Sequence, residues 1–311
     1  MFDQPANDLR AAATVRATTR VSGVGLHSGA HAELVIEPAE AGAGIVFVRS
    51  DVAQPEAQRS IPADPALVTR TQLGTVLTNH AGVEISTVEH LMAAFAMLGV
   101  TDAKVFIDGP EVPILDGSSQ PFIDAMQAVD LRVMAQSVDP IVPNGRVTVA
   151  RGASWAVAEP LPEGAGVDVI LDVTIDFAHP TIGTQRVVIE GDRETILREV
   201  AAARTFCLLQ EVEAMQAMGL ARGGSLENAI VVGDDGIVNP EGLRMPEEFV
   251  RHKALDLVGD LYLLGAPLGC KITAHKPGHT INTALALALA DNAGIQATPE
   301  ASEAEPVAAL A

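Results

Sequence analysis

The sequence has few cysteines and few basic residues, and it lacks long apolar runs. Cys207 and Cys270 are its two cysteines and form no C-x-x-C pair, which argues against a cysteine-ligated metal and favours a reducing cytoplasm. Lys and Arg number 20 against 40 Asp and Glu, a formal net charge of −20. This balance argues against nucleic acid or an anionic membrane as a partner.

Signals for membrane insertion, secretion and several enzyme classes are also absent. No apolar run reaches the roughly 18–20 residues of a membrane span, so we expect no integral membrane segment. Residues 1–10 lack the basic and apolar regions of a secretory signal. The chain has no H-E-x-x-H, no G-x-S-x-G and no complete G-x-G-x-x-G, which disfavours thermolysin-like peptidases, serine hydrolases and dinucleotide-binding enzymes.

The hydrophobic pattern predicts two halves, each with several strands and about two main helices. The proline-containing segment 135–146 is the predicted linker. Strands are expected at 32–38, 44–49, 74–79, 103–108, 146–151, 166–176, 184–190 and 270–276, and helices at 86–99, 119–129, 193–203, 208–218, 247–264 and 283–291. The predicted fold class is α+β, with two similar domains, each a β-sheet layered on helices, at 14–134 and 147–291. Residues 1–13 and 292–311 are expected to be a flexible N-terminus and a disordered tail.

The predicted helix 247–264 is apolar on almost every side and yet carries ionisable residues. His252, Asp256 and Asp260 are spaced four residues apart and therefore share one side of the helix. A helix that is apolar all round is normally buried, and a buried carboxylate is costly unless it is paired or bound to a metal. Two interpretations stay open from this helix alone: a solvated or salt-bridged face, or a site for a cation or a proton relay.

A second helix, at 86–99, adds Glu89 and His90. Ser86 and Glu89 fit a capping box, and His90 alone is typical of a satisfied core histidine. His90 combined with His252 and Asp256 would give two imidazoles and a carboxylate, which leave a fourth zinc position open to water, as in catalytic zinc sites. Glu89 would then be placed to remove a proton. His279, after a Pro-Gly turn, and His27, in a glycine-rich turn, are surface histidines or site residues.

Six motifs, in order, resemble one known family. They are STVEHLMAAFAMLG (86–99), GPEVPILDGSSQPF (109–122), ARTF (203–206), RGGSLENAIVV (222–232), EEFVRHKALDLVGDLYLLG (247–265) and HKPGHTIN (275–282). The chain is similar, from about residue 14 to 291, to the zinc-dependent UDP-3-O-acyl-N-acetylglucosamine deacetylases of lipid A biosynthesis. The resemblance implies two similar α+β domains with the active site at their interface.

The resemblance also implies a set of catalytic roles. One zinc ion per chain, with ferrous iron as an alternative, is held by His90, His252 and Asp256. Glu89 is the general base that helps metal-bound water attack the acetamide carbonyl. His279 is the cationic acid that protonates the leaving amine, Asp260 orients it, and Thr205 helps to hold the oxyanion. The implied protein is a cytoplasmic monomer that removes acetate from an acylated UDP-sugar.

Substrate contacts follow from the resemblance as well. Lys253 and Lys276 would balance the diphosphate, Asp176 and Phe177 would contact the nucleotide, and His27 matches the family's glycine-rich turn. Without the family, Phe177 is equally well explained as a core aromatic residue at a strand end. An apolar stripe within 206–228 is typical of core by its pattern, whereas the resemblance makes this segment an insert that forms the acyl passage. The passage residues are Leu208, Val212, Met215 and Met218.

Two other functions compete with the deacetylase. One is a different zinc amidohydrolase on the same scaffold, which would not depend on a lipid-linked substrate. The other is a non-catalytic protein that binds a sugar nucleotide and carries a structural metal. Glu89 beside His90 counts against the second alternative, because a structural site needs no base.

Overall fold

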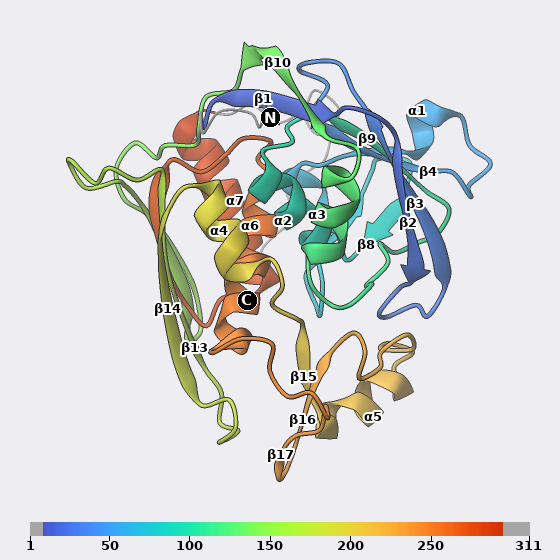
Figure 1. Cartoon of the computed structure of the whole chain (residues 1–311), viewed down its shortest axis with the longest axis vertical. Helices are drawn as coiled ribbons and strands as arrows, with labels where there is room; N and C mark the ends of the chain where they lie inside the picture. The colour runs from blue at the N-terminus through green and yellow to red at the C-terminus, as the bar shows by residue number, and fades with distance from the viewer. Residues whose placement is uncertain (1–8, 295–311) are drawn as a thin grey trace.

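Two five-stranded sheets with the same topology enclose a layer of helices (Figure 1). The computed structural model describes residues 9–294. The N-terminal sheet has the order β2-β3-β9-β4-β5, and the C-terminal sheet has the order β11-β12-β18-β13-β14. In both sheets the central strand, β9 or β18, pairs antiparallel with one neighbour and parallel with the other. The N-terminal strands are β2 (Thr19–Val24), β3 (His31–Pro38), β4 (Ile45–Arg49), β5 (Ser60–Pro62) and β9 (Ala103–Ile107). The C-terminal strands are β11 (Val147–Arg151), β12 (Ser154–Pro160), β13 (Val169–Asp176), β14 (Thr184–Gly191) and β18 (Cys270–His275).

Each half places one helix before its central strand and one after it. In the N-terminal half these helices are α2 (Glu89–Leu98) and α3 (Gln120–Gln127), and in the C-terminal half they are α6 (Glu248–Tyr262) and α7 (His279–Ala293). Helix α4 (Arg193–Val200) also lies in this layer (Figure 1). The strands bury alternate residues, as in β3, where Ala32, Leu34 and Ile36 are buried, because only one face of each sheet covers the helices.

Smaller elements complete each half. Strands β6 (Val68–Arg70), β7 (Val76–Thr78) and β8 (Glu84–Ser86) form a small sheet before α2. In the C-terminal half, β15 (Phe206–Leu208), β16 (Ile230–Gly233) and β17 (Gly236–Ile237) form another, and α5 (Leu209–Ala217) packs on it at the lower end of Figure 1. Strands β1 (Ala11–Val15) and β10 (Leu131–Ser137) pair with each other, and α1 (Glu56–Arg59) and the 3₁₀ helix η1 (Pro65–Leu67) are single turns.

The predicted α+β class with two similar halves is confirmed, but several boundaries differ. Residues 11–13, expected to be flexible, lie in β1, and the predicted linker 135–146 starts inside β10. These two strands pair across more than a hundred residues of chain, which local periodicity does not report. Helix α7 begins at His279 rather than at 283. Strand β12 was not expected, and residues 295–311 of the predicted tail lie outside the described residues.

The described residues contain no helix that is both long and apolar enough to cross a membrane. Even α6, which buries all but Arg251 and Lys253, has 15 residues and carries a stripe of ionisable groups. Its apolar surface is explained by its position between the two sheets.

Candidate metal centre and active site

Helices α2 and α6 touch at Gly259, and this contact brings the two halves of the site together. A Cβ atom at Gly259 would clash with the carbonyl oxygen of Glu89 and approach the amide nitrogen of Ala93. Only a residue without a side chain therefore allows the two helix backbones this close approach. As a result, Glu89 and His90 at the start of α2 lie beside the ionisable stripe of α6.

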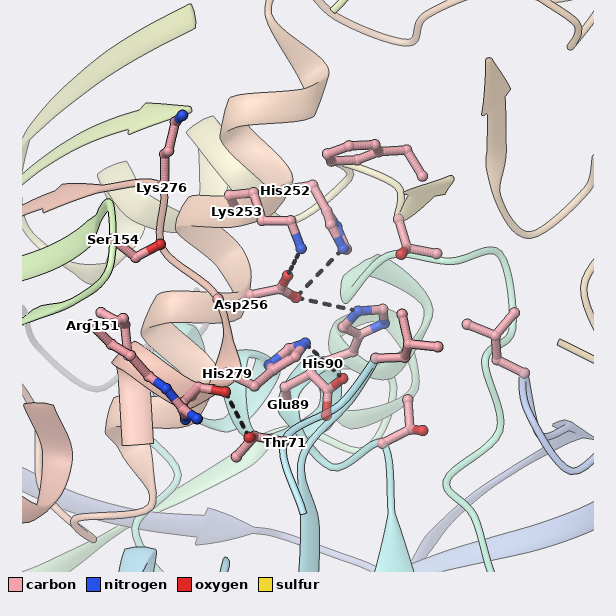
Figure 2. A pocket seen from close by; sticks show the side chains of 18 residues that line it. Thr71, Glu89, His90, Arg151, Ser154, His252, Lys253, Asp256, Lys276 and His279 are labelled. Atoms are coloured by element: carbon pink, nitrogen blue, oxygen red, sulfur yellow. Dashed lines mark hydrogen bonds and ion pairs between the residues drawn. The ribbon is translucent and has the colours of Figure 1, made fainter. Parts of the chain in front are cut away.

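His90, His252 and Asp256 converge on one point in the buried interior (Figure 2). Each offers a ligand atom, and these atoms lie within 4.8 Å of one another. Oδ1 of Asp256 lies 3.6 Å from Nε2 of His90 and 3.4 Å from Nε2 of His252. The three residues are between 1% and 4% exposed, so the solvated-face interpretation of the α6 stripe is wrong.

The three side chains fit a divalent metal ion. Tetrahedral zinc with bonds of about 2.0–2.1 Å separates its ligand atoms by roughly 3.3 Å, close to the two distances found. Oδ1 of Asp256, the oxygen that faces both imidazoles, is buried without a hydrogen-bond partner among the described residues, which is costly unless a cation satisfies it. Nδ1 of His252 lies 3.0 Å from the carbonyl oxygen of Ala203, an arrangement that orients metal-binding imidazoles.

The electrostatics of the cluster favour the protonation states that metal binding requires. Burial lowers the pKa of His252 to about 3, so its imidazole is neutral. Burial acts to raise the pKa of Asp256, but the ammonium group of Lys253 holds it well below its ordinary value. Nζ of Lys253 lies 2.8 Å from Oδ2 of Asp256, which leaves Oδ1 free. Burial opposes the charge of Lys253, yet Asp256 raises the pKa of its ammonium group.

Glu89 and His279 lie next to the three metal-ligand candidates and face each other. Oε1 of Glu89 is 3.7 Å from Nε2 of His279 (Figure 2). Nδ1 of His279 is 2.9 Å from Oδ2 of Asp260, which also accepts a hydrogen bond from Asn282 at 2.8 Å. The capping-box prediction for Glu89 is wrong, because α2 has Val88 at its N-cap position and no side-chain cap.

Thr75 connects these two carboxylates. Its backbone N–H donates to Oε2 of Glu89 at 3.0 Å, and its hydroxyl donates to Oδ1 of Asp260 at 2.5 Å. Thr75 is fully buried, and it immediately precedes β7, so the small sheet of the N-terminal half holds both side chains in place. Sequence reasoning missed Thr75 and Asn282, since neither residue type signals this role without its neighbours.

The Glu89 and His279 environments shift their pKa values upward for different reasons. Burial raises the pKa of Glu89, partly offset by the nearby His279 and His90. Burial alone would lower the pKa of His279, but Asp260 and Glu89 raise it to about 10. A carboxyl with a raised pKa beside an imidazolium is the arrangement expected for proton transfer.

A cavity of about 620 Å³ opens onto these groups. Of the predicted residues, its walls include Glu89, His90, Thr205, His252, Lys253, Asp256, Lys276 and His279. Thr71, Arg151, Ser154 and Thr280 also line it, and these were not predicted (Figure 2 labels all but Thr280). Arg151 ends β11, Ser154 begins β12, Thr71 follows β6 and Thr280 lies in the first turn of α7, so no single motif marks all four.

Three predicted substrate residues do not line this cavity. Asp176 forms an ion pair with Lys276 at 2.8 Å, and Phe177 packs edge-on against Phe206, 5.5 Å between ring centres. His27 lines a neighbouring cavity of about 520 Å³ that shares Thr71 and Thr87 with the first, and its Nε2 is 2.9 Å from the carbonyl oxygen of Leu73. Asp176 and Phe177 therefore contact residues that line the main cavity, Lys276 and Phe206, but do not line it themselves.

The apolar stripe of α5 is not core. Helix α5 contains no buried residue, and Met218 is 61% exposed. Leu208, Val212 and Met215 are half-buried. The helix covers only a three-stranded sheet, which is too small to bury the stripe. Apolar surface thus remains open beside the segment that contributes Thr205 and Phe206 to the cavity.

Comparison with known proteins identifies the family. Residues 12–291 match the protein family described as UDP-3-O-acyl N-acetylglycosamine deacetylase. The chain belongs to this family. It is similar to the UDP-3-O-acyl-N-acetylglucosamine deacetylase of Phenylobacterium zucineum, with 46% identity over 277 residues, 89% of this chain and 92% of that protein. The deacetylases of Myxococcus xanthus (46% identity; 86% and 83% coverage) and Shewanella violacea (40% identity; 89% and 88% coverage) are similar as well.

Proposed function

We propose that the protein removes acetate from UDP-3-O-acyl-N-acetylglucosamine, an early step of lipid A biosynthesis. The observation that carries the proposal is that the three metal-ligand candidates share a cavity with Glu89 and with His279, whose Nδ1 contacts the buried Asp260. A structural metal site would need no such acid–base pair. Membership of the deacetylase family supports the same activity.

His90, His252 and Asp256 are the residues that would hold the ion. Two imidazoles and a carboxylate suit zinc, and ferrous iron is the alternative. When bound, such an ion polarises a carbonyl group and lowers the pKa of water. Lys253 would keep Asp256 in an orientation that exposes one oxygen, and Ala203 would fix the ring of His252.

Glu89 and His279 would take part in two separate proton transfers, Glu89 as the acceptor and His279 as the donor. Glu89, held by Thr75, accepts a proton from the attacking water as the new C–O bond forms. His279, kept cationic by Asp260, donates a proton to the amide nitrogen as the C–N bond breaks, so that acetate and a free amine leave. Such acid–base groups each contribute about 10²–10⁴ in rate. Thr205, in the cavity wall, would donate to the developing oxyanion.

Basic residues of the cavity would receive the diphosphate of the substrate. Lys253, Lys276 and Arg151 line the same space in a chain whose net charge is −20. Asp176 would orient Lys276 through their ion pair. Phe177, packed on Phe206, would support the nucleotide from behind, and His27 would contact substrate from the adjoining cavity.

The exposed apolar side of α5 would accommodate the acyl chain. Leu208, Val212, Met215 and Met218 retain accessible surface in this segment, which is near the cavity through Phe206. Flexible methionine side chains adapt to a chain of variable shape. An acyl chain lying there would bury surface that the fold itself leaves open.

The proposal is tested by metal analysis of the purified protein together with acetate release from UDP-3-O-acyl-N-acetylglucosamine. The matched control substrate is UDP-N-acetylglucosamine without the acyl chain. Acetate release that requires the acyl chain and disappears after chelation would support the proposal. Equal rates on both substrates would favour another amidohydrolase, and nucleotide-sugar binding without acetate release would favour a binding protein.

A further inference from the structure

Arg204 and Glu248 form a buried ion pair that the proposed chemistry does not use. The Arg204 side chain is 1% exposed and that of Glu248 is 0% exposed. Nε of Arg204 donates to Oε1 of Glu248 at 2.9 Å, and the backbone N–H of Arg204 donates to the same oxygen at 3.1 Å. The remaining guanidinium nitrogens donate to Glu241 and to the carbonyl oxygen of Gly242, each at 2.7 Å.

The pair joins two segments that both face the cavity. Glu248 is the first residue of α6 and lies one turn before His252. Arg204 lies between Ala203, whose carbonyl oxygen contacts Nδ1 of His252, and Thr205, which lines the cavity. Phe206 follows, and its ring packs edge-on against His252. The segment 203–206 therefore presents the Ala203 carbonyl, Thr205 and Phe206 to the site, whereas the buried side chain of Arg204 does not line the cavity.

The backbone around Glu248 is held in an unusual conformation. Glu247 adopts a left-handed conformation with φ of 55°, which a residue with a side chain seldom adopts. The second carboxylate oxygen of Glu248 accepts from the backbone N–H of Arg244 at 2.6 Å. Strained backbone of this kind persists where surrounding contacts determine it, and it is common beside functional sites.

We infer that the Arg204–Glu248 pair positions His252 and Thr205, and so sets both metal affinity and turnover. The methyl side chain of Ala203 makes no polar contact that could fix the position of its carbonyl group. The guanidinium of Arg204 fixes this segment instead, because it binds Glu248 at the start of α6. The inference rests on the proposed function for turnover, but not for metal binding. Arg204 is a positioning residue, because it touches neither the cavity nor the metal-ligand atoms.

The alternative is that the pair only stabilises the fold, and a neutral pair separates the two roles. Removing one partner would leave an uncompensated buried charge, whereas replacing both is often tolerated. The test variant is therefore Arg204→Met combined with Glu248→Gln, in which the single amide oxygen still accepts from one of the two backbone N–H groups that Glu248 binds. The matched control is Arg186→Met with Asp172→Asn, an exposed pair at 2.7 Å between β13 and β14.

The measurements are Co²⁺ affinity by chelator competition, the visible absorption of bound Co²⁺, and kcat and KM for acetate release. We expect the Arg204/Glu248 variant to bind Co²⁺ at least about tenfold more weakly, with an altered spectrum, and to lose kcat with little change in KM. The control should match the wild type in every measurement. Arg204→Lys, which keeps the charge but fewer contacts, should fall between them.

Unchanged Co²⁺ affinity and spectrum in the neutral variant would overturn the inference, and so would an unchanged Co²⁺ affinity in Arg204→Lys if the neutral variant does not fold. The Co²⁺ measurements need no substrate. If the wild type released no acetate but the neutral variant still weakened Co²⁺ binding, the proposed function would fail while the positioning role would stand.

Discussion

Helices α2 and α6 occupy equivalent places in the two halves but contribute to the site in different ways. Each precedes the central strand of its sheet, and the two pack against each other. α2 supplies Glu89 and His90 from its first turn, next to each other in sequence. α6 supplies His252, Asp256 and Asp260 along two turns of a helix that is buried almost throughout. α2 is also buried almost throughout, so the difference is that the ionisable residues of α6 are spread along the helix, where segments from both halves contact them.

The ionisable side chains of α6 are held by more contacts than Glu89 of α2. The residues of α6 are fixed by neighbours on every side, including Lys253, Ala203, Thr75 and Asn282. Glu89 is held by the single N–H of Thr75 and faces His279 across a longer distance. Groups that hold an ion need fixed geometry, whereas a proton-transfer group needs access to the reacting atoms. The two halves share one topology, and the two helices differ in the side chains that they contribute to the site.

The largest expected effect comes from removing either of the two imidazoles, His90 on α2 or His252 on α6. His90→Ala and His252→Ala should both lose metal and activity together, each lowering metal affinity by more than about 100-fold, since each removes a proposed ligand. Metal content after dialysis and chelator competition measure this. A variant that kept normal metal affinity would remove its histidine from the site and break the equivalence of the two helices.

Glu89→Gln should separate the two roles on α2 itself. The change keeps the size of the side chain but removes its ability to accept a proton, so kcat should fall by about 10²–10⁴. Metal content should stay at the wild-type value because the three ligand candidates are untouched. Metal analysis and steady-state kinetics on the same preparation decide the matter, and normal turnover would exclude Glu89 as the base.

The pH profile tests the Asp260 partner from α6. The pKa of His279 is raised to about 10, so its imidazole is cationic below that pH, and with His279 as the proposed acid activity should fall as pH rises through it. Asp260→Asn removes the main charge that raises this pKa, and should move the alkaline limb of kcat/KM to lower pH by about 1–3 units. A limb that stayed in place in both Asp260→Asn and His279→Ala would show that another group titrates.

The smallest expected effect concerns the contact between the helices. Gly259→Ala should lower the free energy of unfolding by about 1–3 kcal/mol, because the new methyl group clashes with the backbone of α2. Leu287→Ala, at a position in α7 that is 42% exposed, is the control and should change it by less than about 0.5 kcal/mol. Denaturant unfolding compares them. Gly259→Ala with wild-type stability would mean that the close approach is not required.

Local patterns predicted most of the elements that carry the site. The i, i+4 spacing placed His252, Asp256 and Asp260 on one side of α6, and apolar residues on the other sides predicted that this stripe is buried. The same reasoning failed for α5, whose stripe has an equally apolar pattern but no buried residue. Periodicity reports which residues share a face. It does not report whether another part of the chain covers that face.

The sequence by itself determined the chemical types available: two imidazoles and a carboxylate for an ion, a glutamate beside one of them, and a histidine in a Pro-Gly turn. It also determined the family, through motifs in a fixed order. Only the tertiary structure decided that Thr75 links Glu89 to Asp260 and that Arg204 pairs with Glu248 at the start of α6. Those contacts join segments far apart in the chain, and burial and electrostatic environment are sums over such neighbours, which no local pattern contains.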